Sequence, residues 1–215
     1  MLAIFDVEGV LFDAEYLPIL AETIGKGDHI WEITKKGISG SINWEKGLRM
    51  RVEELRGISY TECKKVADLL PLMPGAREAC SILKNAGWKL MAVSGGFTIM
   101  TDRLKNELDL DYIYSNELLF NDDKLDGVKI NVDSDKAKPA LQKISEWKEK
   151  PENIVVTVDG ANDLNLFDIC GLGIAYRAQE QVQRLADNII KEKDLLQIID
   201  IIEDHYGKPL RQNKQ

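Results

Sequence analysis

The sequence has little of what disulfide frameworks and histidine-based sites need. Its 215 residues include three cysteines, Cys63, Cys80 and Cys170, with no CxxC pair, and two histidines, His29 and His205, far apart in the chain. The cysteine count is odd and the spacings match no zinc motif, so neither a disulfide framework nor a zinc site is expected. Two isolated histidines also argue against a multi-histidine metal site and most histidine-based catalysis.

Excess positive charge and a long apolar run are also missing. Lys and Arg number 28 against 36 Asp and Glu, a net charge of −8, so binding of nucleic acid through a basic face is not expected. No apolar run approaches the roughly 18 residues of a membrane helix. The opening MLAIFDVEGVLF has no basic region and contains two acids, so we do not expect it to be a signal peptide. We expect a globular cytoplasmic protein, a monomer or a homodimer.

Short apolar runs rich in Ile, Val, Leu and Ala predict buried parallel strands, because they lack the strict alternation of half-exposed strands. These runs are Leu2–Val7, Leu90–Ser94, Ile154–Val158 and Leu172–Tyr176. Helical patterns separate them, for example at 76–86 and 137–147. Alternating strands and helices predict an open α/β fold, a Rossmannoid parallel sheet with helices on both faces.

A long stretch without a strand pattern separates the first predicted strand from the second. Apolar residues at helical spacing predict helices at 18–24 and 44–55, and Ser59 with Glu62 forms a capping box that begins a third. A simple crossover between strands needs far less chain. We therefore expect residues 15–71 to form a helical cap inserted after the first strand.

The remaining residues, 1–14 and 72–215, are expected to form the α/β core. Within the core, an alternating segment at about 117–132 surrounds the turn sequence NDDK and predicts a small hairpin.

Polar residues stand where three of the predicted strands end. The first strand ends at Asp6, the second at Ser94-Gly95-Gly96 and the third at Asp159, with Asn162 and Asp163 close behind. The carboxyl ends of parallel strands meet at one edge of a sheet, and ligands bind just beyond that edge. Turn chemistry explains a single acid at a strand end, whereas three such ends together predict a functional site.

The acids at this edge, Asp6, Glu8, Asp159 and Asp163, would repel one another unless a cation held them. Oxygen ligands favour Mg²⁺, which also binds beside phosphate. Lys138, near the start of a predicted helix, would add a positive charge, and the Ser94 turn would offer a hydroxyl and backbone N–H groups to an anion. Such a site is suited to neutralising and positioning a phosphoryl group.

The segments that carry these residues resemble the four motifs of the haloacid dehalogenase superfamily. They are DVEGVL at 6–11, VSGGF at 93–97, Lys138, and DGAND at 159–163. The similarity is greatest to the phosphoserine phosphatase branch, runs from residue 2 to about residue 203, and includes the cap segment 40–51.

The resemblance implies that Asp6 is the nucleophile, which forms an aspartyl phosphate. Glu8 stands in place of the second aspartate of the family, the acid–base residue. The carboxylates of Asp6 and Asp159 and the backbone carbonyl of Glu8 would hold Mg²⁺, with Asp163 acting through a bound water.

The resemblance also implies residues for the substrate. The expected phosphate ligands are Ser94, Gly95, Lys138 and Asn162. In the cap, Glu15 would bind a substrate ammonium and Arg51 a carboxylate, for which a guanidinium is well shaped; a surface ion pair between these two residues is the alternative. Trp44 and Phe97 are expected to be packing residues. The implied activity is a magnesium-dependent phosphatase acting on a small phosphorylated metabolite, phosphoserine, in serine biosynthesis.

Two positions depart from the family pattern. Glu8 is one methylene longer than aspartate but keeps nearly the same intrinsic pKa, and DVEGVL also resembles the opening of a phosphoserine:homoserine phosphotransferase branch. Val158 replaces a usual glycine, and its branched side chain restricts the backbone. Two alternatives to hydrolysis therefore remain: phosphoryl transfer to another alcohol, and non-catalytic binding of a small molecule.

Overall fold

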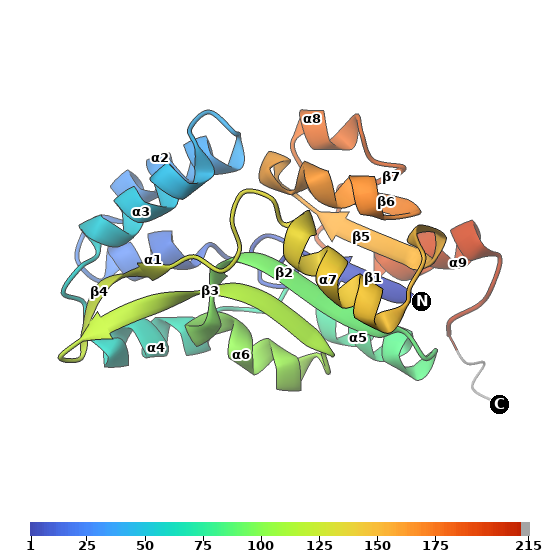
Figure 1. The fold of residues 1–215 in the computed structure, drawn as a ribbon, viewed down its shortest axis with the longest axis horizontal. Coiled ribbons are helices and arrows are strands. Elements are labelled where there is room, and N and C mark those ends of the chain that lie inside the picture. Colours follow the sequence, from blue (N-terminus) through green and yellow to red (C-terminus); the bar gives the residue numbers. More distant parts are fainter. Residues whose placement is uncertain (212–215) are drawn as a thin grey trace.

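Seven strands form one sheet in the computed structural model, which describes residues 1–211 (Figure 1). Their order across the sheet is β4-β3-β2-β1-β5-β6-β7, and within the described chain β4 is the one antiparallel strand. The strands are β1 (Leu2–Phe5), β2 (Lys89–Phe97), β3 (Tyr112–Asn121), β4 (Lys124–Lys129), β5 (Ile154–Val158), β6 (Leu172–Tyr176) and β7 (Asn188–Ile190). β1 therefore lies at the centre, between β2 and β5.

Helices connect most of these strands. They are α1 (Tyr16–Glu22), α2 (Gly27–Ile38), α3 (Trp44–Glu54), α4 (Tyr60–Leu69), α5 (Ala76–Asn85), α6 (Thr98–Glu107), α7 (Ala137–Trp147), α8 (Glu180–Gln183) and α9 (Gln197–Tyr206), with 3-10 helices η1 (Pro151–Asn153) and η2 (Ala161–Ile169).

Alternate residues of β1 belong to two apolar clusters on opposite faces of the sheet. Ala3 and Phe5 share a cluster with buried residues of α5, α6 and α9, whereas Leu2 and Ile4 share one with α7, α8 and η2. Successive side chains of a strand point to opposite faces, so both faces are covered by helices. The predicted α/β fold with a mainly parallel sheet is confirmed.

The four predicted strands correspond to β1, β2, β5 and β6. The predicted hairpin is present as β3 and β4, but β3 begins earlier, at Tyr112, where it pairs in parallel with β2. β7 has three residues, too few to give a recognisable pattern. Helices α2 and α6 were also not predicted.

Helices α1–α4 lie between β1 and β2 in the chain, and we call residues 15–71 the helical insertion. The Ser59 hydroxyl accepts a hydrogen bond from the Glu62 N–H at 3.2 Å, which is the cap predicted for α4. The division into an insertion and a core with boundaries at 14/15 and 71/72 stays a proposal, and the end of the core at residue 215 lies outside the described residues.

The β3–β4 hairpin extends from the core sheet to the helical insertion (Figure 1). Its turn residues Asp122 and Asp123 have φ values of 46° and 62°. The Gly57 N–H donates to the Leu125 carbonyl at 2.8 Å, and the Tyr60 N–H donates to the Asp123 carbonyl at 2.9 Å. These bonds hold the insertion beside the carboxyl-end edge of the sheet.

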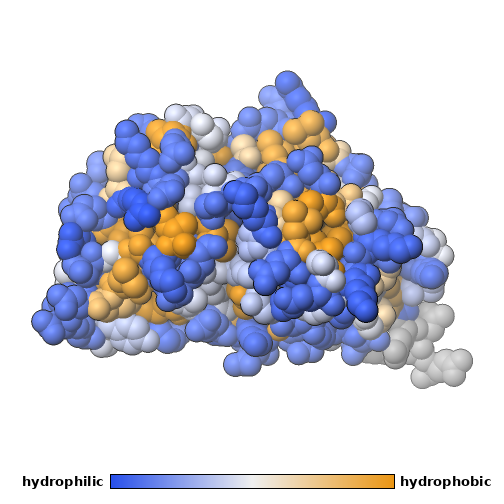
Figure 2. All heavy atoms as spheres, in the orientation of Figure 1, coloured by the Kyte–Doolittle hydropathy of each residue, from blue (hydrophilic) through white to orange (hydrophobic). Residues whose placement is uncertain are grey.

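The surface seen in Figure 2 is mainly hydrophilic, and its apolar areas are separated by hydrophilic residues. Within residues 1–211, every helix is too short or too polar to span a bilayer.

Candidate active site

Three carboxylates meet at the carboxyl-end edge of the sheet. Asp6 directly follows β1, Asp159 directly follows β5, and Asp163 lies in η2. Each places an oxygen within 4.8 Å of an oxygen of the other two. The first turn after β1 permits this approach, because Gly9 has a φ of +81° and a Cβ there would lie 2.2 Å from Asp159 Oδ2. The predicted convergence of these three acids is therefore present.

A lysine is buried among these acids. Lys136 Nζ donates to Asp6 Oδ1 at 2.8 Å and lies 2.5 Å from Asp163 Oδ1. Lys136 is 2% exposed and Asp163 fully buried. Burial disfavours the charged ammonium, but the charges of Asp163 and Asp6 outweigh that effect and raise the pKa of Lys136. The lysine is therefore a permanent positive charge in the site.

The structure corrects the sequence prediction of Lys138 as the site lysine. The Lys138 side chain is exposed and pairs with Asp133 and Asp135 at 3.6 and 3.5 Å. Lys136 immediately precedes α7, whose first residue is Ala137. Side chains two positions apart at the start of a helix point in nearly opposite directions. Lys136 therefore enters the site, whereas Lys138 faces solvent.

The acid cluster carries more negative charge than Lys136 can neutralise. Burial, followed by the charge of Asp6, raises the pKa of Asp159 well above its usual value and that of Asp163 to about 8. Asp163 Oδ2 is buried and has no hydrogen-bond partner within residues 1–211. With all three carboxylates ionised, one ammonium leaves two negative charges, which a divalent cation would balance. The residues present thus fit a Mg²⁺ ion by charge, by ligand type and by an unpartnered oxygen.

The Ser94-Gly95-Gly96 segment, predicted as a turn, lies next to the acids within the last part of β2, where the regular pairing with β3 is interrupted between Val93 and Phe97. We keep the name Ser94 turn for it. The Ser94 hydroxyl oxygen accepts a hydrogen bond from the Gly96 N–H at 2.9 Å, which leaves its proton free to be donated. Asn116 of β3 is fully buried, and its Nδ2 donates to the Gly95 carbonyl at 2.9 Å. Its Oδ1 accepts from the N–H groups of residues 131 and 132, in the loop that leads to Lys136. One side chain therefore supports two parts of the site.

Glu8 lies between the helical insertion and the Ser94 turn. Its Oε1 accepts a hydrogen bond from the Tyr16 N–H, at the start of α1, at 2.7 Å. A Cβ at Gly96 would lie 2.9 Å from Glu8 Oε2. Burial raises the pKa of Glu8, whereas the Tyr16 N–H and the Arg51 charge oppose the rise. The carboxyl group therefore lies between the start of α1 and Gly96, and it is not part of the cluster formed by Asp6, Asp159 and Asp163.

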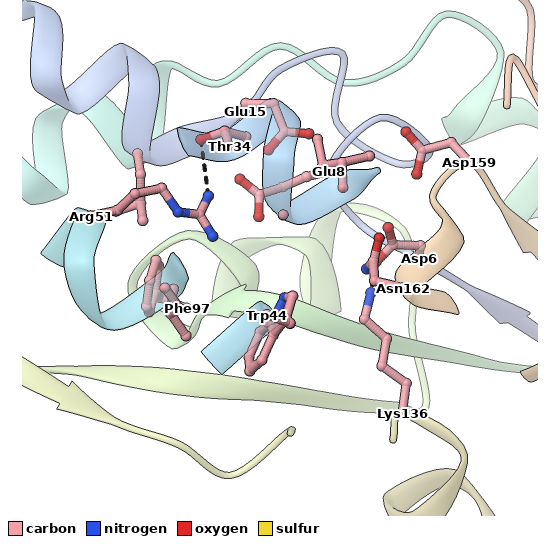
Figure 3. A pocket seen from close by; sticks show the side chains of 15 residues that line it. Asp6, Glu8, Glu15, Thr34, Trp44, Arg51, Phe97, Lys136, Asp159 and Asn162 are labelled. Carbon is pink, nitrogen blue, oxygen red and sulfur yellow. Dashed lines mark hydrogen bonds and ion pairs between the residues drawn. The ribbon is translucent and has the colours of Figure 1, made fainter. Parts of the chain in front are cut away.

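Glu15 and Arg51 line the same cavity from the insertion (Figure 3). Within residues 1–211 no ion pair joins them, so the predicted surface pair is not formed. Arg51 donates to the Thr34 hydroxyl at 3.0 Å and to the Gly47 carbonyl at 3.2 Å. Burial and the nearby Glu8 raise the pKa of Glu15 well above its usual value, and burial lowers the pKa of Arg51. Arg51 is buried and Glu15 half-buried, and a charge shielded from water in this way is costly without a charged partner.

The other predicted residues lie as follows. Asn162 lines the cavity and donates to Asp163 Oδ1 at 3.0 Å. Phe97 is 1% exposed and packs edge-to-face on Tyr16 at 6.0 Å between ring centroids, as a packing residue should. Val158 is buried within β5, and its φ is not positive, so the extended strand accommodates the branched side chain.

Sequence reasoning missed three residues that shape the site: Lys136, Thr34 and Asn116. The spacing of Lys136 from the helix start could have identified it. Thr34 and Asn116 carry no local signal, because their roles depend on partners 17 and 21 residues away along the chain.

Comparisons with known proteins find similar sequences and similar folds. A family model for haloacid dehalogenase-like hydrolases matches residues 1–165. The chain is 35% identical over 204 residues to a phosphoserine phosphatase of Archaeoglobus fulgidus, covering 94% of this chain and 59% of that longer protein. It is 34% identical over 204 residues to a phosphoserine phosphatase of Methanocaldococcus jannaschii, covering 94% and 97%. A phosphoserine phosphatase solved as a phospho-aspartyl intermediate analogue superposes with a TM-score of 0.89 and 33% identity, covering 93% and 97%.

Proposed function

The chain belongs to the haloacid dehalogenase-like hydrolases, and on that premise we propose that it hydrolyses phosphoserine with Mg²⁺ through an aspartyl phosphate. Phosphoserine phosphatases are the relatives named above, and the activity is transferred from them. A cytoplasmic location and a role in serine biosynthesis are part of the same proposal.

The choice of substrate rests on one observation, the unpaired opposite charges of Glu15 and Arg51 in the same cavity. An amino acid carries an ammonium and a carboxylate on one carbon. The ammonium would neutralise Glu15 and the carboxylate would accept from the Arg51 guanidinium. The phosphoryl group of the same molecule would then extend toward the Ser94 turn and Asp6. A phosphorylated amino acid therefore supplies a partner for each of the buried charges.

Asp6, Asp159 and Asp163 would hold Mg²⁺, which neutralises phosphoryl charge when bound. Lys136, Ser94, the Gly95 N–H and Asn162 would bind phosphoryl oxygens. An Asp6 carboxylate oxygen attacks phosphorus, the bond from phosphorus to the serine oxygen breaks, and Glu8 gives its proton to that oxygen. The raised pKa of Glu8 favours the protonated form needed for this step.

The second step regenerates the enzyme. Glu8, now a carboxylate, takes a proton from water as the water oxygen attacks phosphorus. The bond between phosphorus and Asp6 breaks, which releases phosphate and restores the Asp6 carboxylate.

The test is phosphate release from phosphoserine, with and without Mg²⁺, by wild type and by Asp6→Asn. Asp102→Asn, an exposed substitution on α6, serves as the control. We expect activity that requires Mg²⁺, is lost in Asp6→Asn and is unchanged in Asp102→Asn. Phosphoethanolamine, which lacks the carboxylate, should be a poorer substrate. Full turnover by Asp6→Asn would refute the mechanism, and no release by wild type would favour non-catalytic binding.

A second candidate function is transfer of the phosphoryl group to another alcohol. It is favoured by the Glu8 contact with the Tyr16 N–H, because Oε1 is engaged in a 2.7 Å hydrogen bond and only Oε2 remains to take a proton from water. With homoserine added to phosphoserine, this function predicts phosphohomoserine as a product. Release of free phosphate alone would reject it. A large gain in hydrolysis by Glu8→Asp would show that the glutamate restrains the water step.

A further inference from the structure

Trp44 packs against the phosphate-binding turn proposed above. It is the first residue of α3, which Asn43 caps by accepting from the Lys46 N–H. A Cβ at Gly95 would lie 2.9 Å from Trp44 Cζ2 and 3.3 Å from both Cε2 and Nε1. The nitrogen-bearing edge of the indole therefore covers Gly95. A side chain at position 95 could not coexist with the ring in this place.

The indole N–H of Trp44 has no acceptor within residues 1–211. Figure 3 shows the ring nitrogen directed toward the space between Arg51 and Asp6, with no hydrogen bond drawn from it. The same cavity is lined by Arg51, Lys136 and Asn162. An indole N–H is a donor only, and the Trp44 side chain is half-buried, so this donor is available to a ligand in the cavity. The vacant direction here faces the position of the ligand.

We propose that the Trp44 indole N–H donates a hydrogen bond to a phosphoryl oxygen of the substrate, an inference that rests on the proposed phosphatase function. An oxygen that accepts from the Gly95 N–H lies within reach of an indole nitrogen packed over the same glycine. The substrate carboxylate is assigned to Arg51, whose guanidinium is held by Thr34. Trp44 is thus a substrate-binding residue as well as the packing residue expected from the sequence.

The hydrogen bond would join the two parts of the chain. Trp44 belongs to the helical insertion, whereas Gly95 belongs to β2 of the core. The phosphoryl oxygen therefore accepts from both only while α3 lies over the strand end. Binding of the phosphoryl group would favour that arrangement, because a donor from the insertion is lost when α3 moves away.

The experiment observes the indole protons directly. The chain has four tryptophans, and their side-chain N–H resonances can be followed in the ¹H–¹⁵N spectrum while inorganic phosphate is added in the presence of Mg²⁺. Trp44→Phe keeps an aromatic ring but removes the donor, and identifies the Trp44 signal by its loss. Trp31→Phe is the matched control, because Trp31 lies on α2 of the insertion, is 37% exposed and does not line this cavity.

We expect phosphate to move the Trp44 proton signal downfield, and Trp44→Phe to bind phosphate about ten-fold more weakly, as expected for a bond to a charged acceptor. Trp31→Phe should bind phosphate as wild type does. If wild type binds phosphate while the Trp44 signal stays in place and Trp44→Phe binds equally well, the role of Trp44 is refuted and the phosphatase proposal stands. If wild type binds no phosphate, both proposals fail.

Discussion

Individual side chains in this site act through the groups that orient them. Arg51 is placed by the Thr34 hydroxyl, which itself donates to the Ile30 carbonyl at 2.9 Å within α2. Thr34 is 1% exposed. A guanidinium binds a carboxylate well only when its planar donors are correctly directed, so Thr34 is a positioning residue for Arg51.

Thr34→Val should weaken binding of phosphoserine, because valine keeps the shape but cannot accept from Arg51. We expect KM to rise about two- to ten-fold, the value of one hydrogen bond, with a smaller change in kcat. Thr34→Ser retains the hydroxyl and should behave as wild type. Steady-state kinetics with phosphoethanolamine provide the second control, since a substrate without a carboxylate should not respond. An equal loss with both substrates would contradict this role.

Gly9→Ala should weaken Mg²⁺ binding. A methyl group at Gly9 would meet Asp159 Oδ2, and displacing a ligand of this kind typically lowers metal affinity about ten-fold or more. Gly40→Ala is the matched control, because Gly40 has a similar φ of +71° but an added Cβ meets nothing within 4 Å. Titration calorimetry with Mg²⁺ compares the two. Equal Mg²⁺ affinity in both variants would show that the clash between a methyl group at position 9 and Asp159 does not weaken metal binding.

At the scale of elements, the site depends on how β3 joins the end of β2 to the loop before α7. Asn116 supplies this connection through three hydrogen bonds, one to the Gly95 carbonyl and two from the N–H groups of Asn131 and Val132. The parallel pairing of β2 with β3 places Asn116 opposite Phe97, immediately after the turn. The phosphate-binding turn and Lys136 are thereby fixed relative to each other.

Asn116→Ala should cost both stability and activity. Loss of the side chain leaves the buried Val132 N–H unpaired, and two part-buried backbone groups lose their partner, so we expect a loss of about 1–3 kcal/mol in the free energy of unfolding. Asn85→Ala, an exposed substitution on α5, should leave stability nearly unchanged. Urea unfolding measures the first effect, and kcat well below the melting temperature measures the second. Normal kcat in folded Asn116→Ala would contradict a role in positioning the turn.

At the scale of the whole molecule, the acid cluster makes stability depend on pH and on metal. The pKa of Asp163 is raised to about 8 in the folded chain by burial and by Asp6, against about 4 when unfolded. Between these values the folded state holds a proton that the unfolded state has lost. Stability from this group is therefore greatest at low pH and falls as pH rises from about 4 to about 8.

Mg²⁺ should remove this loss of folding stability at high pH, because it replaces the proton as the partner of the carboxylates. We expect the melting temperature without metal to fall between pH 5 and pH 8, and the increase caused by Mg²⁺ to be larger at pH 8. Thermal unfolding with Mg²⁺ or EDTA at each pH measures both. In Asp163→Asn the difference between the two pH values should shrink. A Mg²⁺ effect as large at pH 5 as at pH 8 would contradict the assignment.

The architecture and the position of the acids could be predicted from the amino-acid sequence alone. Runs such as Ile154–Val158 are buried strands because apolar side chains leave water, and parallel strands bring Asp6 and Asp159 to one edge. The motif residues come directly after the ends of predicted parallel strands, so their convergence could be predicted before the fold was known. Phe97 as a packing residue was also predictable from its apolar ring beside a buried strand.

Tertiary structure alone decided which side chains complete the site. Lys136 and Lys138 are alike in local composition, and only the start of α7 against the sheet selects Lys136. Thr34 meets Arg51, and Trp44 meets Gly95, because the helical insertion folds back over the strand ends. Such contacts depend on the packing of distant segments, whereas composition and periodicity report only on neighbours along the chain.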